Sequence, residues 1–205
     1  MNKKATVNLG FLASGRGSNM KAIIDACHDG SLDGHPVVLI SNNAESGALA
    51  IARNEAIPAY HLSSKTHPDI DVLDAVIAET LKQHDVDLVI LAGYMKKIGP
   101  QVLTAYKNKI INIHPSLLPK FGGQGLYGLK VHEAVLAANE RETGVTIHIV
   151  NDEYDKGKIL SQYRIPIRPD DTAESLAIRV LEVEHAFYTE SLQKIITGEI
   201  TLPSS

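Results

Sequence analysis

Hydrophobic residues along the chain form short continuous runs of strand length, separated by stretches in which they recur every three or four positions. The continuous runs are residues 5–13, 37–41, 88–92 and 110–113. Because these runs lack the alternation of a half-exposed strand, they predict strands that are covered on both faces. The stretches with helical spacing are residues 18–29, 45–55 and 70–84. This alternation is typical of an α/β protein with a parallel sheet, in which ligands bind at the carboxyl ends of the strands.

The second half of the chain follows a different pattern. A long loop containing glycine and proline, residues 115–128, precedes a predicted helix at 129–139. Two hydrophobic strands follow at 145–150 and 158–167, and only the turn at 151–157 separates them. Because neighbouring strands joined by so short a turn run antiparallel, we expect an antiparallel addition to the sheet in this half.

A last helix is predicted near the end of the chain. Asp171 is its expected N-cap, and Glu174, three residues on, would complete a capping box. No internal repeat, low-complexity tract or linker divides the sequence. We therefore expect residues 1–205 to form one domain.

Composition narrows the class of protein. The 205 residues are 44% hydrophobic and 21% charged, which is typical of a globular chain. A chain of this length buries about 70% of the surface of its unfolded form, so it needs no disulfide or structural metal. The net charge of −4 and the lack of basic runs argue against a nucleic-acid partner. No stretch approaches the roughly 18 apolar residues of a membrane span, so we expect a cytoplasmic protein.

The single cysteine and the N-terminal segment each have a functional and a structural interpretation. Cys27 lies among apolar residues of a predicted helix, which favours a buried thiol over a reactive one. Residues 1–15 resemble a secretory signal, with a basic end and an apolar stretch. Asn8 and Gly10 interrupt that stretch, which favours a buried first strand.

The first predicted strand ends in a glycine-rich turn, residues 14–19, that leads directly into a helix. Such a turn gathers free backbone N–H groups at the positive end of the helix dipole, which suits a phosphate. The lysine of a P-loop is absent, and Met20 stands where a dinucleotide fingerprint has its third glycine. A phosphomonoester therefore fits better than a nucleotide, and an ordinary tight turn is the structural alternative.

A second motif lies at the end of the strand predicted at 110–113. Asn112 and His114 are two residues apart, so on a strand both side chains point to one face. Pro115 ends regular pairing and presents the imidazole at the rim of the sheet, where substrates bind. The structural alternative is a capping asparagine beside a satisfied core histidine, which the Asn-x-His-Pro context disfavours.

Proton transfer by this histidine near neutral pH needs an acid beside it. Asp152, Glu153 and Asp155 all lie in one turn, where Gly157 would let the backbone turn an acidic side chain inward. The alternative is that all three are solvated. His148, within a strand, is expected to be structural. The sequence contains no nucleophile elbow, His-Glu-x-x-His motif or cysteine pair, so it predicts neither a serine hydrolase nor a zinc enzyme.

These motifs resemble the folate-dependent formyltransferases, and most closely the phosphoribosylglycinamide formyltransferase family. The segment 112–119 is similar to one shared by enzymes that use 10-formyltetrahydrofolate. The segments 144–148 and 155–157 form the second shared motif, and the turn 15–19 resembles the family's ribose-phosphate loop. Related methionyl-tRNA formyltransferases and formyltetrahydrofolate hydrolases carry additional domains for which 205 residues leave no room.

The resemblance implies a formyltransferase fold: a Rossmann-like, mostly parallel sheet flanked by helices. It implies an enzyme that transfers the formyl group of 10-formyltetrahydrofolate, its co-substrate, to the amine of N1-(5-phospho-D-ribosyl)glycinamide in purine biosynthesis. The half at about 1–107 would bind the phosphate, and the half at about 108–205 would carry catalysis and folate. No metal is implied, the partners are small molecules, and a monomer or homodimer is expected.

The resemblance also implies a set of site residues. Catalysis is assigned to Asn112, His114 and Asp155. The phosphate is assigned to Gly17, Ser18 and Asn19, and the glycinamide end to Glu184. Folate is assigned to Met95, Lys96, Lys97, Ile98, Asn112, Asn151, Asp152, Glu153, Tyr154 and Asp155.

Acyl transfer to an amine gives the catalytic residues distinct roles. The Asn112 amide and a protonated His114 would stabilise the oxyanion, and Asp155 would assist proton transfer. Three features depart from the family pattern: Arg16, the pair Lys96–Lys97 and the glycine-rich loop 121–128. Two alternatives stay open, namely a hydrolase or a transferase for another amine, and a non-catalytic module that binds a phosphoribosyl group.

Overall fold

The structure, a computed structural model, describes residues 6–204. The elements in chain order are β1 (Val7–Ala13), α1 (Ser18–Asp29), β2 (Gly34–Ser41), α2 (Gly47–Asn54), β3 (Ala59–His61), α3 (Ile70–Gln83), β4 (Leu88–Leu91), α4 (Pro100–Ala105), β5 (Ile110–His114), α5 (Leu129–Ala137), β6 (Glu142–Ile149), β7 (Ile159–Pro166) and α6 (Ala173–Ile196). The predicted first strand begins at Ala5, which lies outside the described residues. No helix in the described part of the chain is long and apolar enough to cross a membrane.

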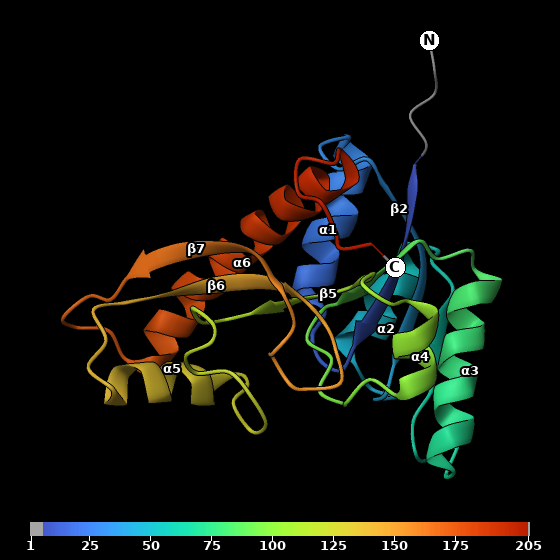
Figure 1. The fold of residues 1–205 in the computed structure, drawn as a ribbon, viewed down its shortest axis with the longest axis horizontal. Helices are drawn as coiled ribbons and strands as arrows, with labels where there is room; N and C mark the ends of the chain where they lie inside the picture. Colours follow the sequence, from blue (N-terminus) through green and yellow to red (C-terminus); the bar gives the residue numbers. More distant parts are fainter. Residues whose placement is uncertain (1–5, 205) are drawn as a thin grey trace.

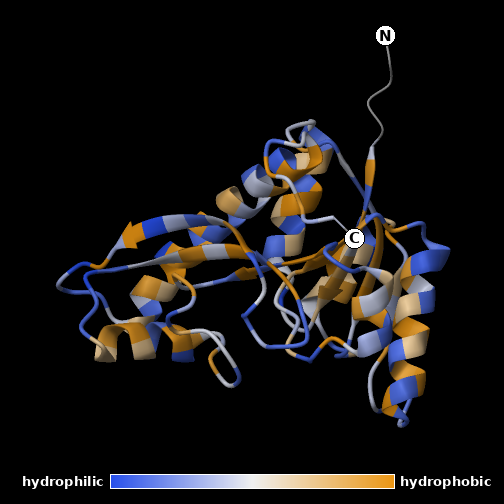
Figure 2. Cartoon of the chain, viewed as in Figure 1, coloured by the Kyte–Doolittle hydropathy of each residue, from blue (hydrophilic) through white to orange (hydrophobic). Residues whose placement is uncertain are grey.

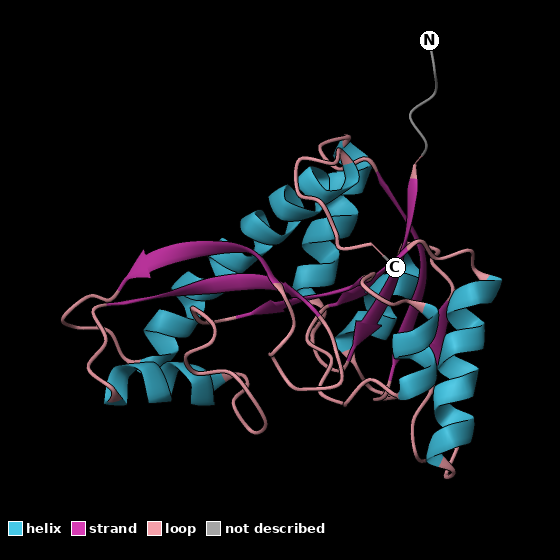
Figure 3. Ribbon diagram, viewed as in Figure 1, coloured by secondary structure: helices cyan, strands magenta, loops and turns pink. Residues whose placement is uncertain are grey.

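One mixed sheet organises the fold (Figure 3). Its strand order is β3-β2-β1-β4-β5-β6-β7. The pairs among β1 to β5 are parallel. β6 runs antiparallel to β5, and β7 antiparallel to β6. The predicted parallel sheet with an antiparallel addition is therefore confirmed.

Two hydrophobic cores lie on opposite faces of this sheet. On one face α1, α2, α5 and α6 pack against the strands, and α1 lies beside α6 (Figure 1). On the other face α3 and α4 cover β1, β2, β4 and the start of β5. The central strands are hydrophobic along their length, whereas α3 has one hydrophobic and one polar side (Figure 2). This arrangement explains why the strands read as continuous apolar runs.

The hydrophobic pattern of the sequence did not predict two short elements, β3 and α4. β3 has three residues and lies at the edge of the sheet, and α4 has six residues after Pro100. Neither is long enough to establish a hydrophobic period. β2 also begins earlier than predicted, at Gly34, and includes Pro36 beside an irregularity in its pairing with β1. A proline is tolerated where pairing is irregular, but it weakens the strand signal.

The predicted cap of α6 is wrong by one residue. Thr172 is the N-cap, and its hydroxyl accepts the N–H of Ser175, whose hydroxyl accepts the N–H of Thr172 in return. Asp171 instead pairs with Arg179 and accepts the N–H of Arg168. The carboxylate thus links the preceding turn to α6, because it accepts from Arg168 on one side and from Ser175 and Arg179 of the helix on the other.

Cys27 lies on α1 and is partly buried against the core. Burial raises the pKa of its thiol to about 11. Since the thiolate is the reactive form, the structural interpretation of this cysteine is favoured.

Tyr188 ties α6 to the centre of the sheet. It is fully buried, and its hydroxyl lies 2.9 Å from the carbonyl oxygen of Ile111 in β5 and 3.1 Å from that of Leu91 in β4. Leu91 is the last residue of β4, and Ile111 directly precedes Asn112 in β5. The hydroxyl therefore supports the strand ends that carry the candidate site.

We expect Tyr188→Phe to lower the free energy of unfolding by about 1 to 2 kcal/mol, because it removes the buried hydrogen bond of the hydroxyl to these carbonyl groups. Urea denaturation measures this change. Tyr163→Phe is the matched control, since Tyr163 is 50% exposed and its loss should change stability by less than about 0.5 kcal/mol. Equal effects of the two substitutions would contradict the role of the Tyr188 hydroxyl.

Candidate active site

A cleft of about 580 Å³ opens at the carboxyl ends of β1, β4 and β5. The turn after β1, the segment after β4, the loop before α5 and the turn after β6 form its walls, together with α6. The predicted site residues that line it are Gly17, Ser18, Asn19, Met95, Asn112, His114, Tyr154, Asp155 and Glu184. The fold thus brings residues from both halves of the chain to one edge of the sheet.

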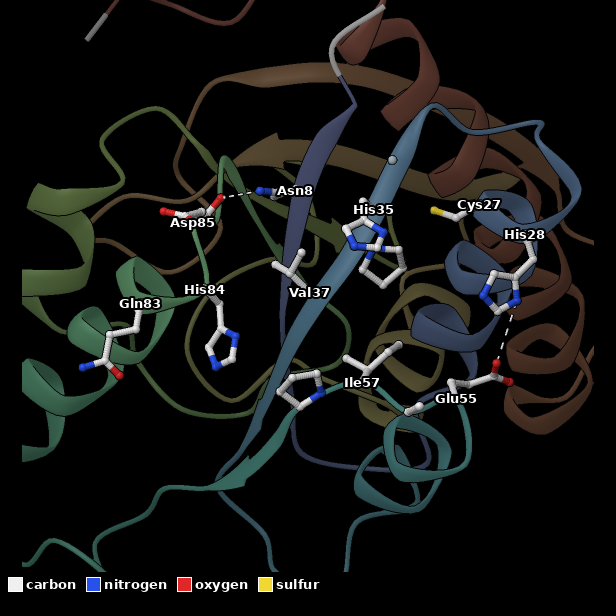
Figure 4. Close-up of a pocket in the computed structure, with 14 residues that line it drawn as sticks. Asn8, Cys27, His28, His35, Val37, Glu55, Ile57, Gln83, His84 and Asp85 are labelled. Atoms are coloured by element: carbon white, nitrogen blue, oxygen red, sulfur yellow. Dashed lines mark hydrogen bonds and ion pairs between the residues drawn. The ribbon is translucent and has the colours of Figure 1, made fainter. Parts of the chain in front are cut away.

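A second cavity, of about 710 Å³, lies at the opposite, amino edge of the sheet (Figure 4). The C-terminal ends of α1, α2 and α3 surround it, and helix C-termini carry the negative end of the dipole. His28, His35 and His84 lie apart from one another there, and His28 faces Glu55 (Figure 4). This edge disfavours an anion, so the cleft at the carboxyl edge is the candidate active site.

The turn before α1 presents the helix N-terminus to the cleft. Gly17, its N-cap residue, has φ 80°, and a Cβ there would lie 2.8 Å from the Cα of Ala48. Only glycine fits both the left-handed backbone and the close approach of α2. Within residues 6–204 no side chain caps α1, so its first N–H groups remain available to a phosphate.

Asn19 and Glu184 meet where α1 passes α6. The Asn19 Nδ2 donates to Glu184 Oε2 over 2.7 Å, and both side chains are largely buried. Burial raises the pKa of Glu184 to about 7, although the bond from Asn19 opposes the shift. The Oδ1 atom of Asn19 is buried without a hydrogen-bond partner in the described chain. This pair therefore offers a titratable carboxyl group and an unused acceptor beside the phosphate loop.

His114 ends β5 and is 5% exposed. Its Nε2 lies 2.8 Å from the carbonyl oxygen of Phe121 and its Nδ1 3.5 Å from Asp155 Oδ2. Because a carbonyl only accepts, Nε2 carries the proton, and in the neutral ring the Nδ1 lone pair faces the acid. Burial lowers the pKa of His114 despite the opposing charge of Asp155. The ligand-free protein therefore favours the neutral form of this ring.

Asn112 is oriented by a residue that sequence analysis took as structural. His148 lies opposite Asn112 in the β5–β6 register. Its Nδ1 donates to the carbonyl oxygen of Ile149 over 2.9 Å, and its Nε2 then accepts from Asn112 Nδ2 over 3.0 Å. These two hydrogen bonds fix the side chain of Asn112. One hydrogen of its amide group is donated to His148, and the other is free within the described chain. The register between strands, which sequence does not show, makes His148 part of the cluster.

Asp155 is turned inward as predicted. It has φ 56°, and its Oδ2 accepts the N–H of Gly123 over 2.9 Å. Gly157 makes this path possible, because a Cβ there would lie 1.7 Å from the carbonyl oxygen of Ile149. Burial alone would raise the pKa of Asp155, but contacts with His148, His114 and Gly123 lower it below its ordinary value. The acid is therefore ionised at neutral pH.

His132 is a further cleft residue that sequence analysis did not select. It lies on α5, is 3% exposed, and its Nδ1 is buried without a partner in the described chain. Burial, reinforced by His114, lowers its pKa to about 4. The only signal in the sequence is a histidine between the apolar residues Val131 and Val135 of a predicted helix.

The predicted folate residues divide into two groups. Met95, Asn112, Tyr154 and Asp155 line the cleft. The others do not: Lys96, Lys97, Ile98, Asn151, Asp152 and Glu153. Of these, Ile98 is buried against α3 and α4, and the remainder are exposed. The side chains of the second group therefore point elsewhere in this structure.

The segment after β4 is held at its far end by a buried acid. Asp74 of α3 accepts the N–H groups of Gln101, over 2.7 Å, and Val102, over 3.3 Å. Gly99 lies against this carboxylate, where a Cβ would be 2.2 Å from its carbon. Asp74 thus fixes the start of α4 and, through it, the end of the segment that borders the cleft.

Among the described residues, no three His, Cys, Asp or Glu side chains are arranged to hold a metal ion.

The sequence of the chain is similar to those of known formyltransferases. The sequence profile of the family described as formyl transferase matches residues 7–192. A chloroplastic phosphoribosylglycinamide formyltransferase of Arabidopsis thaliana is 44% identical over 193 residues, which cover 94% of this chain and 66% of that protein. A phosphoribosylglycinamide formyltransferase of Haemophilus influenzae is 36% identical over 194 residues, which cover 95% of this chain and 89% of that protein.

The fold is also shared with solved structures. The crystal structure of glycinamide ribonucleotide transformylase 1 from Symbiobacterium toebii matches with a TM-score of 0.89 and 37% identity, over 97% of this chain and 92% of that chain. The expected fold class is therefore confirmed. The chain spans less than two thirds of the length of the plant relatives that it matches.

We expect the burial of His132 to make stability depend on pH. The unfolded chain protonates this residue near its ordinary pKa of 6.5, whereas the folded protein does so only near 4, so stability falls as pH drops through this window. Between about pH 7.5 and about pH 4.5 its contribution to the free energy of unfolding should fall by about 2 kcal/mol.

Urea denaturation of the wild type and His132→Gln at both pH values measures the effect, because the variant lacks this titratable group. A pH dependence that is identical in the wild type and His132→Gln would contradict the shifted titration.

Proposed function

Because the chain belongs to the formyl transferase family, we propose that it transfers the formyl group of 10-formyltetrahydrofolate to the amine of N1-(5-phospho-D-ribosyl)glycinamide, a step of purine biosynthesis. The observation that carries this proposal is that one cleft holds an open helix N-terminus at one end and Asn112, His114 and Asp155 at the other. The first suits a phosphate, and the second suits acyl transfer.

The phosphoribosyl substrate would enter with its phosphate on the N-terminus of α1. The N–H groups at Gly17, Ser18 and Asn19 point to this end of the cleft, and the dipole of α1 favours negative charge there. Glu184, beside Asn19, would contact the ribosyl-glycinamide part. Arg16 is exposed next to this turn and would add a charged contact to the phosphate.

The folate would lie along the segment after β4. Tyr94, Lys96 and Lys97 make no backbone hydrogen bonds within the described chain, so their N–H and C=O groups are available to a pterin ring. Met95 and Tyr154 line the cleft on this side. Pterin recognition through backbone groups agrees with side chains that point away, as those of Lys96 and Lys97 do. Contacts with residues 151–153 require the turn after β6 to move toward the ligand.

Each catalytic side chain has a distinct role in the formyl transfer. The amine attacks the formyl carbon, and the free amide hydrogen of Asn112 donates to the oxyanion that forms. His114, together with Asp155, takes the proton that the attacking nitrogen loses, directly or through water, and ionised Asp155 stabilises the imidazolium. The charged ring then supports the oxyanion and returns the proton to the leaving folate nitrogen as the carbon–nitrogen bond breaks.

The two halves of the chain have different roles in the proposed reaction. Residues of about 1–107 supply the phosphate loop and the folate segment, and residues of about 108–205 supply the catalytic cluster and Glu184. A cytoplasmic location and a monomeric or homodimeric state stay predictions.

The activity is tested by following the absorbance of a 10-formyl folate as it loses its formyl group, with and without the ribonucleotide. We expect turnover only when phosphoribosylglycinamide is present. Turnover without it would indicate a hydrolase, and turnover with a different amine would indicate another transferase. No turnover, with retained binding of phosphoribosyl ligands, would leave a binding module.

We expect His114→Ala and Asp155→Asn each to reduce turnover about 10²- to 10³-fold, the range seen when one group that stabilises the transition state is lost. Steady-state kinetics measures the loss, and circular dichroism establishes that both variants fold. His28→Ala and Asp25→Asn are matched controls on the exposed surface of α1, and both should retain wild-type rates. Wild-type rates in the His114 and Asp155 variants would overturn the assignment of the catalytic site.

A further inference from the structure

One side chain, Ser14, joins the ends of three strands at the rim of the cleft. It follows β1, and its hydroxyl accepts the backbone N–H of Met95, after β4, over 2.8 Å. The same hydroxyl donates to Oδ1 of Asn42, after β2. Its backbone N–H donates to the carbonyl oxygen of Gly93 over 3.1 Å, and its own carbonyl accepts from Asn43 Nδ2 over 3.3 Å. Every polar group of Ser14 is therefore engaged with another strand end.

The segment after β4 depends on these bonds. Within the described chain, Ser14 makes both of the hydrogen bonds that hold the backbone of residues 93–97. Met95 is 51% exposed, and no helix or strand includes the segment. Its far end is fixed by the burial of Ile98 and by Asp74. The near end, which borders the cleft, has Ser14 alone.

Ser14 also begins the phosphate loop. Gly15 follows it directly, and the carbonyl of Gly15 accepts the N–H of Ala48 over 3.2 Å at the start of α2. The loop from Gly15 to Asn19 is therefore held on one side by α2 and on the other by Ser14. A ligand that orders the loop orders Ser14 with it, and through Ser14 the amide of Met95.

From this arrangement we propose that Ser14 is a positioning residue that couples the two substrate sites. Its hydroxyl fixes the folate segment 93–97 relative to the phosphate loop 15–19, so that binding of either ligand strengthens binding of the other. The proposal rests on the function proposed above for these two segments. Neither ligand needs to touch the Ser14 side chain, because the ordering of the shared backbone carries the effect.

The coupling is measured by isothermal titration calorimetry with phosphoribosylglycinamide and tetrahydrofolate, which lacks a formyl group and so cannot react. For the wild type we expect saturating tetrahydrofolate to tighten the ribonucleotide at least about 5-fold, the lower end of typical coupling between sites. In Ser14→Ala the tightening should fall below about 2-fold, because the amide of Met95 loses its acceptor. Ser14→Thr keeps the hydroxyl and should restore the coupling.

Ser46→Ala is the matched control. Ser46 is buried near the same loop and caps α2, where its hydroxyl accepts the N–H of Leu49, but it makes no bond to residues 93–97. It should lower stability and leave the coupling as in the wild type. If Ser14→Ala weakens each ligand alone but keeps the wild-type coupling, Ser14 is merely structural and the proposal is overturned.

Two other outcomes separate this proposal from the proposed function. If the wild type binds both ligands with no mutual effect, the coupling is overturned and the function stands. If the wild type binds neither ligand, the proposed function fails and the coupling fails with it. Amide hydrogen exchange gives a readout without ligands, since the peptide containing Met95 should exchange faster in Ser14→Ala than in Ser46→Ala.

Discussion

The antiparallel pairing of β6 with β5 is the contact on which the candidate active site depends. Its register sets His148 opposite Asn112 and Thr146 opposite His114. A shift by one residue would turn these side chains to the other face, where the α1 and α6 core lies. The same pairing places the end of β6 beside the start of β5. The turn after β6 then folds back along β5 and brings Asp155 within reach of His114. The parallel part of the sheet then needs only to supply the phosphate loop and the folate segment at the same edge.

Burial controls the electrostatics of this site. His114 and His132 are kept neutral because a buried imidazolium loses its hydration, and Asp155 remains ionised because it accepts an N–H group and lies between two histidines. The neutral His114 beside ionised Asp155 can accept a proton. Once it is protonated, it can donate that proton again. Glu184 is shifted in the opposite sense, toward the protonated form, by the same loss of hydration. The cleft therefore holds groups that change charge readily when a substrate excludes water.

The two cavities show how helix direction selects the binding edge. Both lie at an edge of the sheet, and the amino-edge cavity is the larger. The α1 dipole presents its positive end to the cleft and its negative end to the other cavity, which the ends of α2 and α3 also face. An anionic substrate is thus favoured at the first and disfavoured at the second, whatever their volumes. Rigid attachment of the loops at the favoured edge, through Ser14 and Asp74, then gives the site a defined shape.

The sequence by itself determined the alternating strands and helices, the antiparallel addition, a turn at 151–157 that could direct one of its acids inward, and the shared face of Asn112 and His114. These follow from periods of two and of three to four residues and from glycine at positions of close approach, which are local properties. The tertiary structure alone decided that His148 orients Asn112, that His132 lines the cleft and that Asn19 meets Glu184 across 165 positions of sequence. It also placed the Lys96 and Lys97 side chains outside the cleft. Such contacts depend on strand register, helix packing and loop path, which arise from interactions between distant segments and leave no periodic signal in the sequence.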